Sequence, residues 1–465
     1  MMMDSFSQKK EHIPFPQKIS RNVHPAHTLA LSFLMIIILG TILLSLPWSC
    51  AEGTLSFLDA LFTATSATCV TGLIVVQTGE KFTQFGQIVI LSLIQIGGLG
   101  IMTFSTLFAY LIAGRLSIRG HVIAEESIGR GPLPHVGRLL LFIVLGTFVV
   151  EAIGGLILSL RFSADYPPGY AFFLGFFHSI SAFCNAGFSL FPNSLVDYRN
   201  DPIVNLTIMM LIIIGGLGFW VLFDLKNIRG PRGLRALTMH SKIVLTMTAI
   251  LIGTGFVGIM LLEWNNTLAD LSLSGKILSA AFQSVTSRTA GFNTIPIENL
   301  TNSTLLLLII FMMIGASPGS CGGGIKTTTF GVLMAMIFSR LRDQQQVRLF
   351  NRGVPETIIS KSIGIAFFWL VAVTSVSMLL LVSEHPGGPH ELGRTLFIET
   401  IFEAFSAMGT VGLSMGLTPF LTGIGKVMII LLMYIGRIGP VTIALAIAVG
   451  KPLRIRLAEE KFMVG

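Results

Sequence analysis

One short pattern recurs four times along this chain, each time between two apolar segments. It reads SATCVTGL, SAFCNAGF, TSRTAGF and SAMGTVGL, and its marker glycines are Gly72, Gly187, Gly291 and Gly412. A phenylalanine precedes each glycine at a near-constant offset: Phe62, Phe177, Phe282 and Phe402. A second marker follows in the next apolar run, as IGGLG at Ile96 and Ile214, IGASPG at Ile314 and IGRIG at Ile435. Two markers in register four times predict an internal repeat.

The segments around these turns are apolar enough to span a membrane. The chain is 52% hydrophobic and 12% charged, whereas soluble domains carry about 25% charged residues. Apolar runs long enough to cross a bilayer as helices fall at 28–48, 85–112, 138–160, 202–225, 242–262, 303–339, 362–383 and 423–450. The sequence therefore predicts an all-α integral membrane protein, with eight transmembrane helices in four helix–pore loop–helix repeats and pseudo-fourfold symmetry around one pore.

The basic residues set the expected orientation in the membrane. Of 31 Lys and Arg residues, 22 lie in the N-terminal tail, in 113–138, 226–242 and 340–361, and in the C-terminal tail. Cytoplasmic loops carry such an excess, so both termini and all repeat linkers are expected in the cytoplasm of a multi-pass cell-membrane protein. The predicted division is a tail at 1–27, repeats at 28–112, 138–225, 242–339 and 362–450, and a tail at 451–465.

Several function classes are not supported by the composition. The net charge of +8 could suggest a nucleic-acid partner, but clusters between apolar runs are typical of membrane loops. The first 27 residues contain no apolar core, so we expect no cleaved signal peptide. The four cysteines and nine histidines show no disulfide or metal-ligand spacing. No nucleophile–base pairing is present, so the chain is not expected to be an enzyme or to carry a covalently bound cofactor.

The four turns predict a ring of carbonyl oxygens. Non-helical backbone at membrane depth is costly unless it is buried in protein or lines water, and four such turns can satisfy this by converging on one axis. Their carbonyls could then replace the water shell of a cation. The predicted selectivity filter comprises Val70, Thr71, Gly72, Asn185, Ala186, Gly187, Thr289, Ala290, Gly291, Thr410, Val411 and Gly412. The alternative is that these small residues are ordinary helix-packing positions.

The third repeat interrupts its second helix with GASPGSCGGGIKTTT, from Gly315 to Thr329. Proline and five glycines cannot sustain a regular helix. The pattern is near that of a phosphate-binding loop, but Ile325 separates Gly324 from Lys326, which argues against nucleotide binding. We expect a movable gate beneath the filter, with a static kink as the alternative. The gate residues are Gly315, Pro318, Gly319, Gly322, Gly323, Gly324 and Lys326, together with Arg437.

Arg437, Arg288, Glu151 and Glu403 are charged residues within the predicted membrane segments and pore loops. A buried arginine needs polar partners, so Arg437 is expected to face the axis and to bind carbonyls around Gly322–Gly324, tethering the gate closed. Arg288 is expected to brace the filter through backbone carbonyls. Glu151 and Glu403 are each as consistent with a packing role as with an ion site. Two carboxylates do not supply the relay that an H⁺-coupled carrier would need.

These features together resemble the Trk/Ktr/HKT potassium transporter superfamily. The resemblance rests on the four filter glycines, TSRTAGF, the GGGIKT break and GRIG, and it covers the chain from about residue 28 to its end. The short N-terminal tail is similar to that of the KtrB branch with eight crossings, and unlike TrkH-type members with two additional N-terminal helices. One departure is Cys321 with Pro318 in the loop, where smaller residues are usual.

The resemblance implies several properties beyond the residues themselves. Family members pass K⁺ through a four-repeat pore, assemble as homodimers and are regulated by a cytoplasmic ring of nucleotide-binding RCK subunits of the KtrA type, often with Na⁺ dependence. The nucleotide would bind the partner only. Gly72 favours K⁺, because serine at this position accompanies Na⁺ selectivity in related plant proteins. The basic linkers, including Arg232 and Arg235, would dock the ring. The alternative is a Na⁺-selective or non-selective cation channel or transporter of the same architecture.

Overall fold

Helices dominate the structure, and a long helix followed by two shorter ones recurs along the described residues. The computed structural model describes residues 25–100, 136–226, 237–384 and 394–439. Each repeat opens with a long helix: α1 (Pro25–Leu44), α7 (Val136–Phe162), α11 (Met239–Leu262) and α15 (Glu356–Glu384). All four are long and apolar enough to cross a membrane. The bilayer core is about 30 Å thick, which about 20 helical residues span.

A shorter helix follows each long one and ends at one of the four turns. These half-helices are α2 (Phe57–Thr68), α8 (Pro168–Phe183), α12 (Leu273–Thr286) and α16 (Arg394–Gly409). Two of them begin with serine caps, because Ser56 accepts from the Asp59 amide and Ser272 from the Gly275 amide. Such caps satisfy amides that have no partner within the helix. Each of the four turns is therefore preceded by a helical segment.

A third helix completes each repeat: α4 (Gln84–Leu99), α9 (Pro202–Leu217), α13 (Asn302–Met313) and α17 (Gly423–Ile438). Three of the four end at a glycine with positive φ, namely Gly100 at 82°, Gly218 at 90° and Gly439 at 91°. These glycines are the last residues of the IGGLG and IGRIG markers. Glycine adopts positive φ without the penalty that a Cβ imposes, so the marker ends the helix there.

Two sequence predictions need correction in these third helices. The run 202–225 was predicted as one span, but it breaks at Gly218 into α9 and α10 (Phe219–Lys226), which are bent by 96°. The interruption in repeat 3 was predicted over 315–329, but α14 (Thr327–Leu341) already includes its last three residues. The non-helical segment is therefore 314–326, which we call the intramembrane loop.

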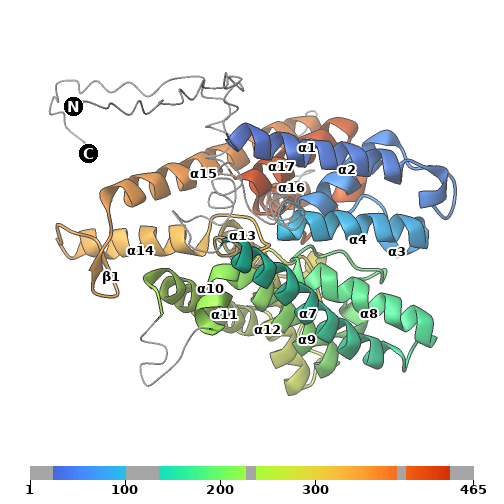
Figure 1. The fold of residues 1–465 in the computed structure, drawn as a ribbon, viewed down its shortest axis with the longest axis horizontal. Helices are drawn as coiled ribbons and strands as arrows, with labels where there is room; N and C mark the ends of the chain where they lie inside the picture. The colour runs from blue at the N-terminus through green and yellow to red at the C-terminus, as the bar shows by residue number, and fades with distance from the viewer. Residues whose placement is uncertain (1–24, 101–135, 227–236, 385–393, 440–465) are drawn as a thin grey trace, which may run out of the picture.

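Short elements connect the helices at the two ends of the molecule. They are η1 (Pro47–Ser49), α3 (Thr78–Lys81), η2 (Val196–Tyr198), η4 (Ile297–Asn299) and η6 (Thr418–Phe420), with one hairpin of β1 (Arg348–Leu349) and β2 (Arg352–Gly353). The hairpin joins α14 to α15, and these two helices project together away from the other repeats (Figure 1). The linkers 113–138 and 226–242 lie largely outside the described residues, and Arg232 and Arg235 lie wholly outside them.

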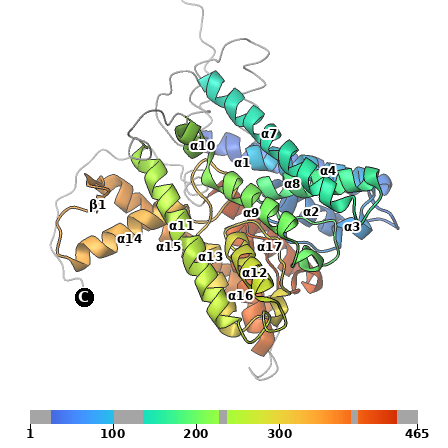
Figure 2. The ribbon, with the colours of Figure 1, turned by 90° about the horizontal axis from the view of Figure 1, so that it is seen from below.

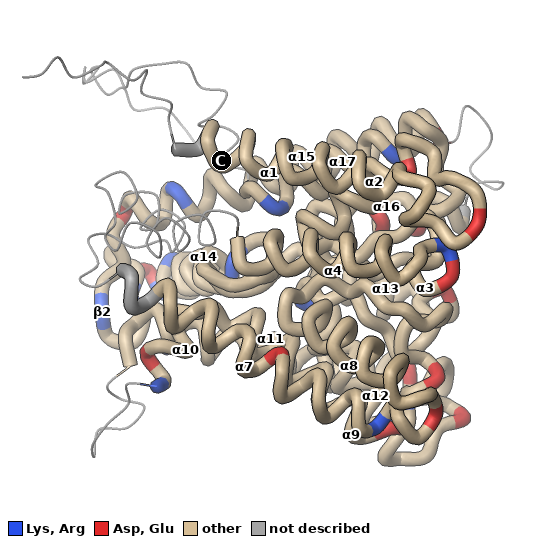
Figure 3. The backbone as a smooth tube through the Cα atoms, turned by 45° about the vertical axis from the view of Figure 1, so that its right-hand side comes forward, with Lys and Arg blue, Asp and Glu red and all other residues tan. Residues whose placement is uncertain are grey.

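The first helices surround the half-helices and turns. Figure 2 shows α11 running beside α12 and α13, and α16 packs on α13, α15 and α17. Fully buried side chains in this interior include the four marker phenylalanines, Phe62, Phe177, Phe282 and Phe402. Most charged residues lie toward the two ends of the helices, and the stretch between them is largely uncharged (Figure 3). This distribution is that of a protein whose middle lies in a bilayer.

Candidate ion site

The four turns share one unusual backbone conformation. The first residue of each turn has positive φ without being glycine: Val70 at 49°, Asn185 at 57°, Thr289 at 66° and Thr410 at 49°. The glycine two residues later also has positive φ: 95° at Gly72, 71° at Gly187, 81° at Gly291 and 90° at Gly412. Positive φ is costly for β-branched residues such as valine and threonine. A conformation that recurs in register four times, and is costly in the three turns that begin with valine or threonine, makes these turns a candidate functional site.

Hydrogen bonds direct the amides of the turns backward and leave the carbonyls free. The middle amide of each turn donates to the half-helix before it: Thr71 to Ser66 O and Val411 to Ser406 O at 2.8 Å, and Ala290 to Thr286 O at 3.0 Å. The Ala186 amide does the same to Ser181 O at 2.8 Å. Within the described part of the chain, no donor binds a carbonyl of the twelve turn residues. These oxygens are therefore available to a ligand.

The four glycines close into a ring. A Cβ built on Gly72 would lie 2.5 Å from Ala186 O, and one on Gly187 would lie 2.8 Å from Ala290 O. A Cβ on Gly291 would lie 2.6 Å from Val411 O, and one on Gly412 would lie 2.0 Å from Thr71 O. Each turn therefore packs against the next, and the fourth packs against the first. Only glycine permits this approach, which explains why the marker residue is glycine in all four repeats.

A cavity opens on the side of the ring toward the short connecting elements. Its volume is about 480 Å³, and all four glycines line it. The residue two positions after each glycine lines it too: Ile74, Ser189, Asn293 and Ser414. Four carbonyl-rich turns at the base of one cavity form a site that can receive a partly hydrated cation.

The intramembrane loop lies against the opposite side of the ring. A Cβ on Gly322 would lie 2.1 Å from the Thr289 hydroxyl, and one on Gly323 would lie 2.2 Å from the Thr410 hydroxyl. Both threonine hydroxyls are buried and lack a hydrogen-bond partner among the described residues. The loop glycines thus reach the first residues of the third and fourth turns, where a side chain would not fit.

The loop is held by the broken helix of repeat 2. Its Cys321 amide donates to Gly215 O at 3.2 Å and its Ser317 amide to Gly216 O at 3.1 Å, while the Phe219 amide donates to Gly319 O at 3.0 Å. The bend at Gly218 leaves carbonyls at the end of α9 without helical partners, and amides of the loop donate to these carbonyls instead. The sequence analysis missed this role of the second IGGLG marker, since the same letters occur in repeat 1.

Two basic side chains hold the loop. Arg437 of α17 donates to Cys321 O in the loop and to Gly97 O in α4. The acceptors were expected around Gly322–Gly324; the loop acceptor is the adjacent Cys321 O, while Gly322 O and Gly323 O accept from Lys326. The Lys326 ammonium lies 2.6 Å from Gly322 O and 3.4 Å from Gly323 O. The guanidinium fork lets Arg437 bind two carbonyls from different repeats at once.

The remaining charged candidates are hydrogen-bonded by other side chains, which come from the same repeat for Arg288 and Glu403 and from repeat 1 for Glu151 of repeat 2. The expectation that Arg288 would bind backbone carbonyls is wrong, because its Nη2 donates to Thr248 Oγ1 of α11 at 3.4 Å. Glu151 accepts from Gln95 Nε2 at 3.1 Å. Glu403 accepts from the hydroxyls of Ser414 and Thr418. Neither carboxylate is among the residues that line the cavity above the ring.

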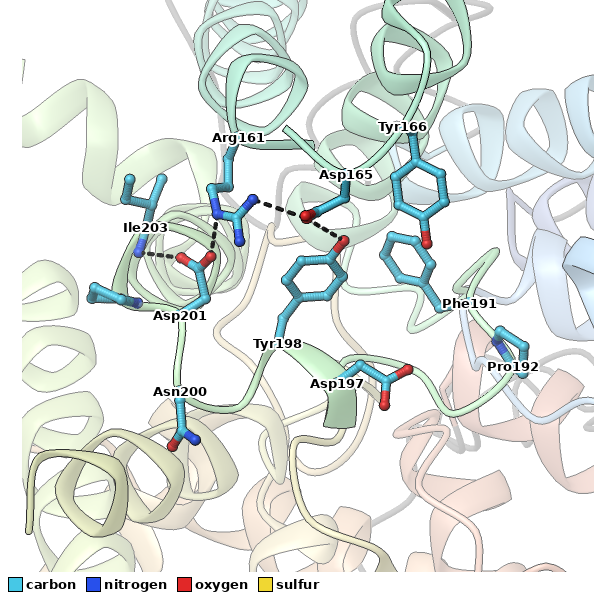
Figure 4. Close-up of a pocket in the computed structure, with 11 residues that line it drawn as sticks. Arg161, Asp165, Tyr166, Phe191, Pro192, Asp197, Tyr198, Asn200, Asp201 and Ile203 are labelled. Atoms are coloured by element: carbon cyan, nitrogen blue, oxygen red, sulfur yellow. Dashed lines mark hydrogen bonds and ion pairs between the residues drawn. The ribbon is translucent and has the colours of Figure 1, made fainter. Parts of the chain in front are cut away.

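A second pocket lies beside this cavity, and the two share Phe191 and Pro192. Figure 4 shows its polar centre, where Arg161 contacts Asp165 and Asp201 and the Tyr198 hydroxyl donates to Asp165 at 3.1 Å. Burial, with this hydrogen bond, raises the pKa of Tyr198 above its usual value. Asp201 also caps α9 by accepting from the amides of Ile203 and Val204. These charges satisfy one another, so we assign the cluster a structural role.

Comparison with known proteins agrees with this architecture. The family model described as TrkH, cation transport protein, matches residues 6–453. The chain is 40% identical to Ktr system potassium uptake protein B of Bacillus subtilis, over 95% of this chain and 97% of that protein. It is 41% identical to the protein of the same name from Vibrio alginolyticus, over 94% of each chain.

A third relative and a solved structure extend the comparison. Potassium/sodium uptake protein NtpJ of Enterococcus hirae is 35% identical, over 97% of this chain and 99% of that protein. The crystal structure of the potassium transporter TrkH from Vibrio parahaemolyticus matches the fold with a TM-score of 0.70 at 18% identity, covering 90% of this chain and 85% of the other. A family match over nearly the whole length and relatives above 30% identity establish that the chain belongs to the TrkH family of cation transport proteins, which are ion transporters and not enzymes.

Proposed function

We propose that this chain is the membrane pore of a potassium uptake system, with the twelve turn residues as its selectivity filter. The observation that carries the proposal is the closed ring of four positive-φ glycines, whose neighbouring carbonyls have no donor among the described residues. A dehydrated cation needs several oxygen ligands to replace its hydration shell. Four turns around one axis supply such a shell, which supports a pseudo-fourfold arrangement of four repeats with eight crossings.

The electrostatics of the half-helices favour a cation over an anion. Each half-helix ends immediately before its turn, so its C-terminal end is directed to the ring. That end carries the partial negative charge of the helix dipole. Four such ends stabilise positive charge at the centre of the ring. The buried bases Lys326 and Arg437 lie on the other side, at the intramembrane loop.

The loop 314–326 is proposed as the gate. It lies directly beneath the ring and is held by Arg437, by Lys326 and by the bend in repeat 2. Each of these contacts is a hydrogen bond to backbone, and the loop also packs through Ile314, Cys321 and Ile325 in three apolar clusters. Rearrangement of the contacts around Cys321 would clear the path for the ion.

Relatives of this chain are named potassium uptake proteins, and one is named for potassium and sodium. We therefore assign K⁺ as the transported ion and Na⁺ as a candidate activator. The Ktr system name indicates further components. The proposal includes a homodimer in the cell membrane, both termini in the cytoplasm, and a nucleotide-binding RCK ring as regulator. A Na⁺-selective or non-selective pore of the same architecture is the alternative.

Complementation tests the assignment directly. The chain, expressed with and without a KtrA-type subunit, should restore growth of a potassium-uptake-deficient bacterium on low-K⁺ medium. Purified protein in liposomes should take up Rb⁺ in preference to Na⁺. Failure to restore growth, at normal expression and with the regulatory subunit present, would contradict K⁺ uptake. Equal Rb⁺ and Na⁺ fluxes would favour the alternative.

A further inference from the structure

The residue after each marker phenylalanine is polar and buried in all four half-helices. These residues are Thr63, His178, Gln283 and Glu403, and none is more than 2% exposed. Burying a polar side chain costs free energy unless it is hydrogen-bonded. Apolar packing therefore does not explain why this buried position is polar in all four half-helices.

In repeat 4 this residue holds the cavity wall. Glu403 accepts a hydrogen bond from the hydroxyl of Ser414, and its other oxygen accepts from Thr418 Oγ1 at 2.8 Å. Ser414 lies two residues after Gly412 and lines the cavity above the ring. On the near side of the same turn, the Gly412 amide donates to Ser406 Oγ at 3.0 Å. The fourth turn is thus fixed on both sides of its glycine.

In repeat 2, a histidine side chain holds the corresponding part of the cavity wall. The Nδ1 of His178 lies 2.8 Å from Leu174 O, so this nitrogen carries the proton and Nε2 is an acceptor. Nε2 lies 3.0 Å from Ser189 Oγ and accepts from the Leu190 amide at 3.4 Å. Ser189 lies two residues after Gly187 and lines the cavity. The imidazole also stacks on Phe191, another lining residue, with centroids 4.6 Å apart.

Repeats 1 and 3 lack this contact among the described residues. Thr63 donates to Asp59 O of its own helix at 2.8 Å, and the cavity residue of repeat 1 is the apolar Ile74. Neither polar side-chain atom of Gln283 has a hydrogen-bond partner in the described part of the chain, and the cavity residue of repeat 3, Asn293, donates to Ile295 O at 3.0 Å. The contacts around the ring run from repeat 1 to 2, 3 and 4, so the two held walls face each other.

We propose that His178 and Glu403 are positioning residues that fix two opposite walls of the outer cavity, through Ser189 and Ser414, and thereby set the discrimination between K⁺ and Na⁺. This inference rests on the proposed function. The two side chains touch no ion. They hold the chain two residues from the glycines whose turns carry the free carbonyls, and the spacing and field of those carbonyls decide which ion is bound.

The test uses mild substitutions in the full-length protein, Ser189→Ala and Ser414→Ala, because each removes one hydroxyl and leaves the buried imidazole or carboxylate in place. Uptake of Rb⁺ and of Na⁺ is measured in liposomes for each variant. We expect each to lower the Rb⁺/Na⁺ uptake ratio by about fivefold or more, since loss of one hydrogen bond corresponds to about fivefold and each hydroxyl also accepts from a backbone amide, that of Phe191 or Gly416. The double variant should show about the product, because the two walls are not in contact.

Two further variants separate positioning from general stability. Thr63→Val is the matched control, since it removes a buried hydroxyl at the same repeat position without touching the cavity wall, and its uptake ratio should equal that of the wild type. Glu403→Ala removes the contacts with both Ser414 and Thr418, so its effect on the uptake ratio and that of Ser414→Ala should be less than additive in the double variant.

The possible outcomes distinguish this inference from the proposed function. A wild type that takes up neither ion contradicts the proposed function itself. A selective wild type whose Ser189→Ala and Ser414→Ala variants keep its Rb⁺/Na⁺ ratio overturns the positioning role alone. A fall in both fluxes by the same factor also overturns it, because that result indicates a merely structural contact.

Discussion

Gly412 lies so close to Thr71 that a Cβ on the glycine would be 2.0 Å from the threonine carbonyl oxygen. The two residues are separated by most of the chain, and they join the fourth turn to the first. This contact closes the ring, because the other three pairs already link neighbouring turns. A single chain thus acquires the cyclic geometry that symmetric channels obtain from four subunits.

Replacement of Gly412 by alanine should abolish most ion uptake. The new methyl would strike Thr71 O, and alanine is strained at the φ of 90° that this residue adopts. Overpacking costs about 1–3 kcal/mol, so we expect Rb⁺ uptake to fall by about tenfold or more. Rb⁺ flux into liposomes at matched protein density measures the effect.

Gly416 provides the matched control for this variant. Its φ is 91°, but a Cβ there would meet no atom within 4 Å. Gly416→Ala therefore carries the same backbone strain without the clash in the ring. We expect it to keep at least half of the wild-type flux. Equal losses in the two variants would attribute the effect to backbone strain and contradict the importance of the ring contact.

Replacement of Arg437 by glutamine should raise ion flux. The wild-type guanidinium holds Cys321 O of the loop and Gly97 O of α4 together, and a glutamine amide cannot reach both. Hydrogen bonds of charged groups contribute about 1.5–3 kcal/mol each, so an open loop should become about tenfold more populated. Rb⁺ uptake in the absence of a regulatory subunit reports this change most directly.

Lys426 lies on the same helix and serves as the control for Arg437. It pairs with Asp59 at 2.7 Å, near the beginning of α17 and away from the loop. Lys426→Gln removes one positive charge from the same element but leaves the loop contacts unchanged, so its flux should match the wild type. Unchanged or reduced flux in Arg437→Gln, at normal expression, would exclude the tether.

The turns and the helix interruption could be predicted from sequence because each requires a particular residue type, glycine or proline. A turn that needs positive φ and close approach at Gly72 or Gly291 tolerates only glycine, and a proline with five glycines must interrupt a helix. The bend at Gly218 could not be predicted, because IGGLG is the same in repeats 1 and 2. It depends on the loop of repeat 3, which supplies donors to Gly215 and Gly216.

The positioning contacts were missed for a related reason. Thr63, His178, Gln283 and Glu403 share no chemistry, so no motif connects them. Aligning the repeats on their phenylalanines brings these four into one column of polar residues, and that column is the signal that could have identified them. Which of the four reaches the cavity wall depends on the residue two positions after the glycine, which is serine in repeats 2 and 4 but not in repeats 1 and 3.

Replacement of Glu263 by glutamine should lower thermal stability at neutral pH. Glu263 is fully buried at the end of α11, where one oxygen accepts from Thr301 and Thr304 and the other from Asn266 and Thr267. A glutamine NH₂ group would face donors on one side. An unsatisfied buried group costs about 1–3 kcal/mol, so the melting temperature should fall by a few degrees.

The loss of stability caused by Glu263→Gln should be larger at neutral pH than at acid pH. Burial alone would raise the pKa of Glu263, but the hydrogen bonds from Thr304 and Thr301 outweigh it and hold the pKa below its ordinary value. The ionised carboxylate therefore stabilises the fold fully above the unfolded pKa of about 4.3, and this stability is lost as pH falls through the lower folded pKa. The difference in melting temperature between the wild type and Glu263→Gln should be largest at pH 7 and should disappear below a pH of about 4. A gap independent of pH would contradict the role of the charge.

Replacement of Gly323 by alanine should displace the loop from the ring and increase flux. A Cβ there would lie 2.2 Å from the Thr410 hydroxyl, so either the loop or the fourth turn must move. The turn is fixed by the bonds of Val411 to Ser406 and of Ser414 to Glu403, whereas the glycines Gly322–Gly324 of the loop have no side chains to anchor them. We therefore expect the loop to yield, with Rb⁺ uptake several-fold above wild type and an unchanged Rb⁺/Na⁺ ratio. Ser320→Ala is the control, because its hydroxyl binds only Ser317 O within the loop and its loss leaves the contact with the ring intact. A changed ratio in Gly323→Ala would mean that the turn had moved instead, and reduced flux with the same ratio would contradict the loop as a gate.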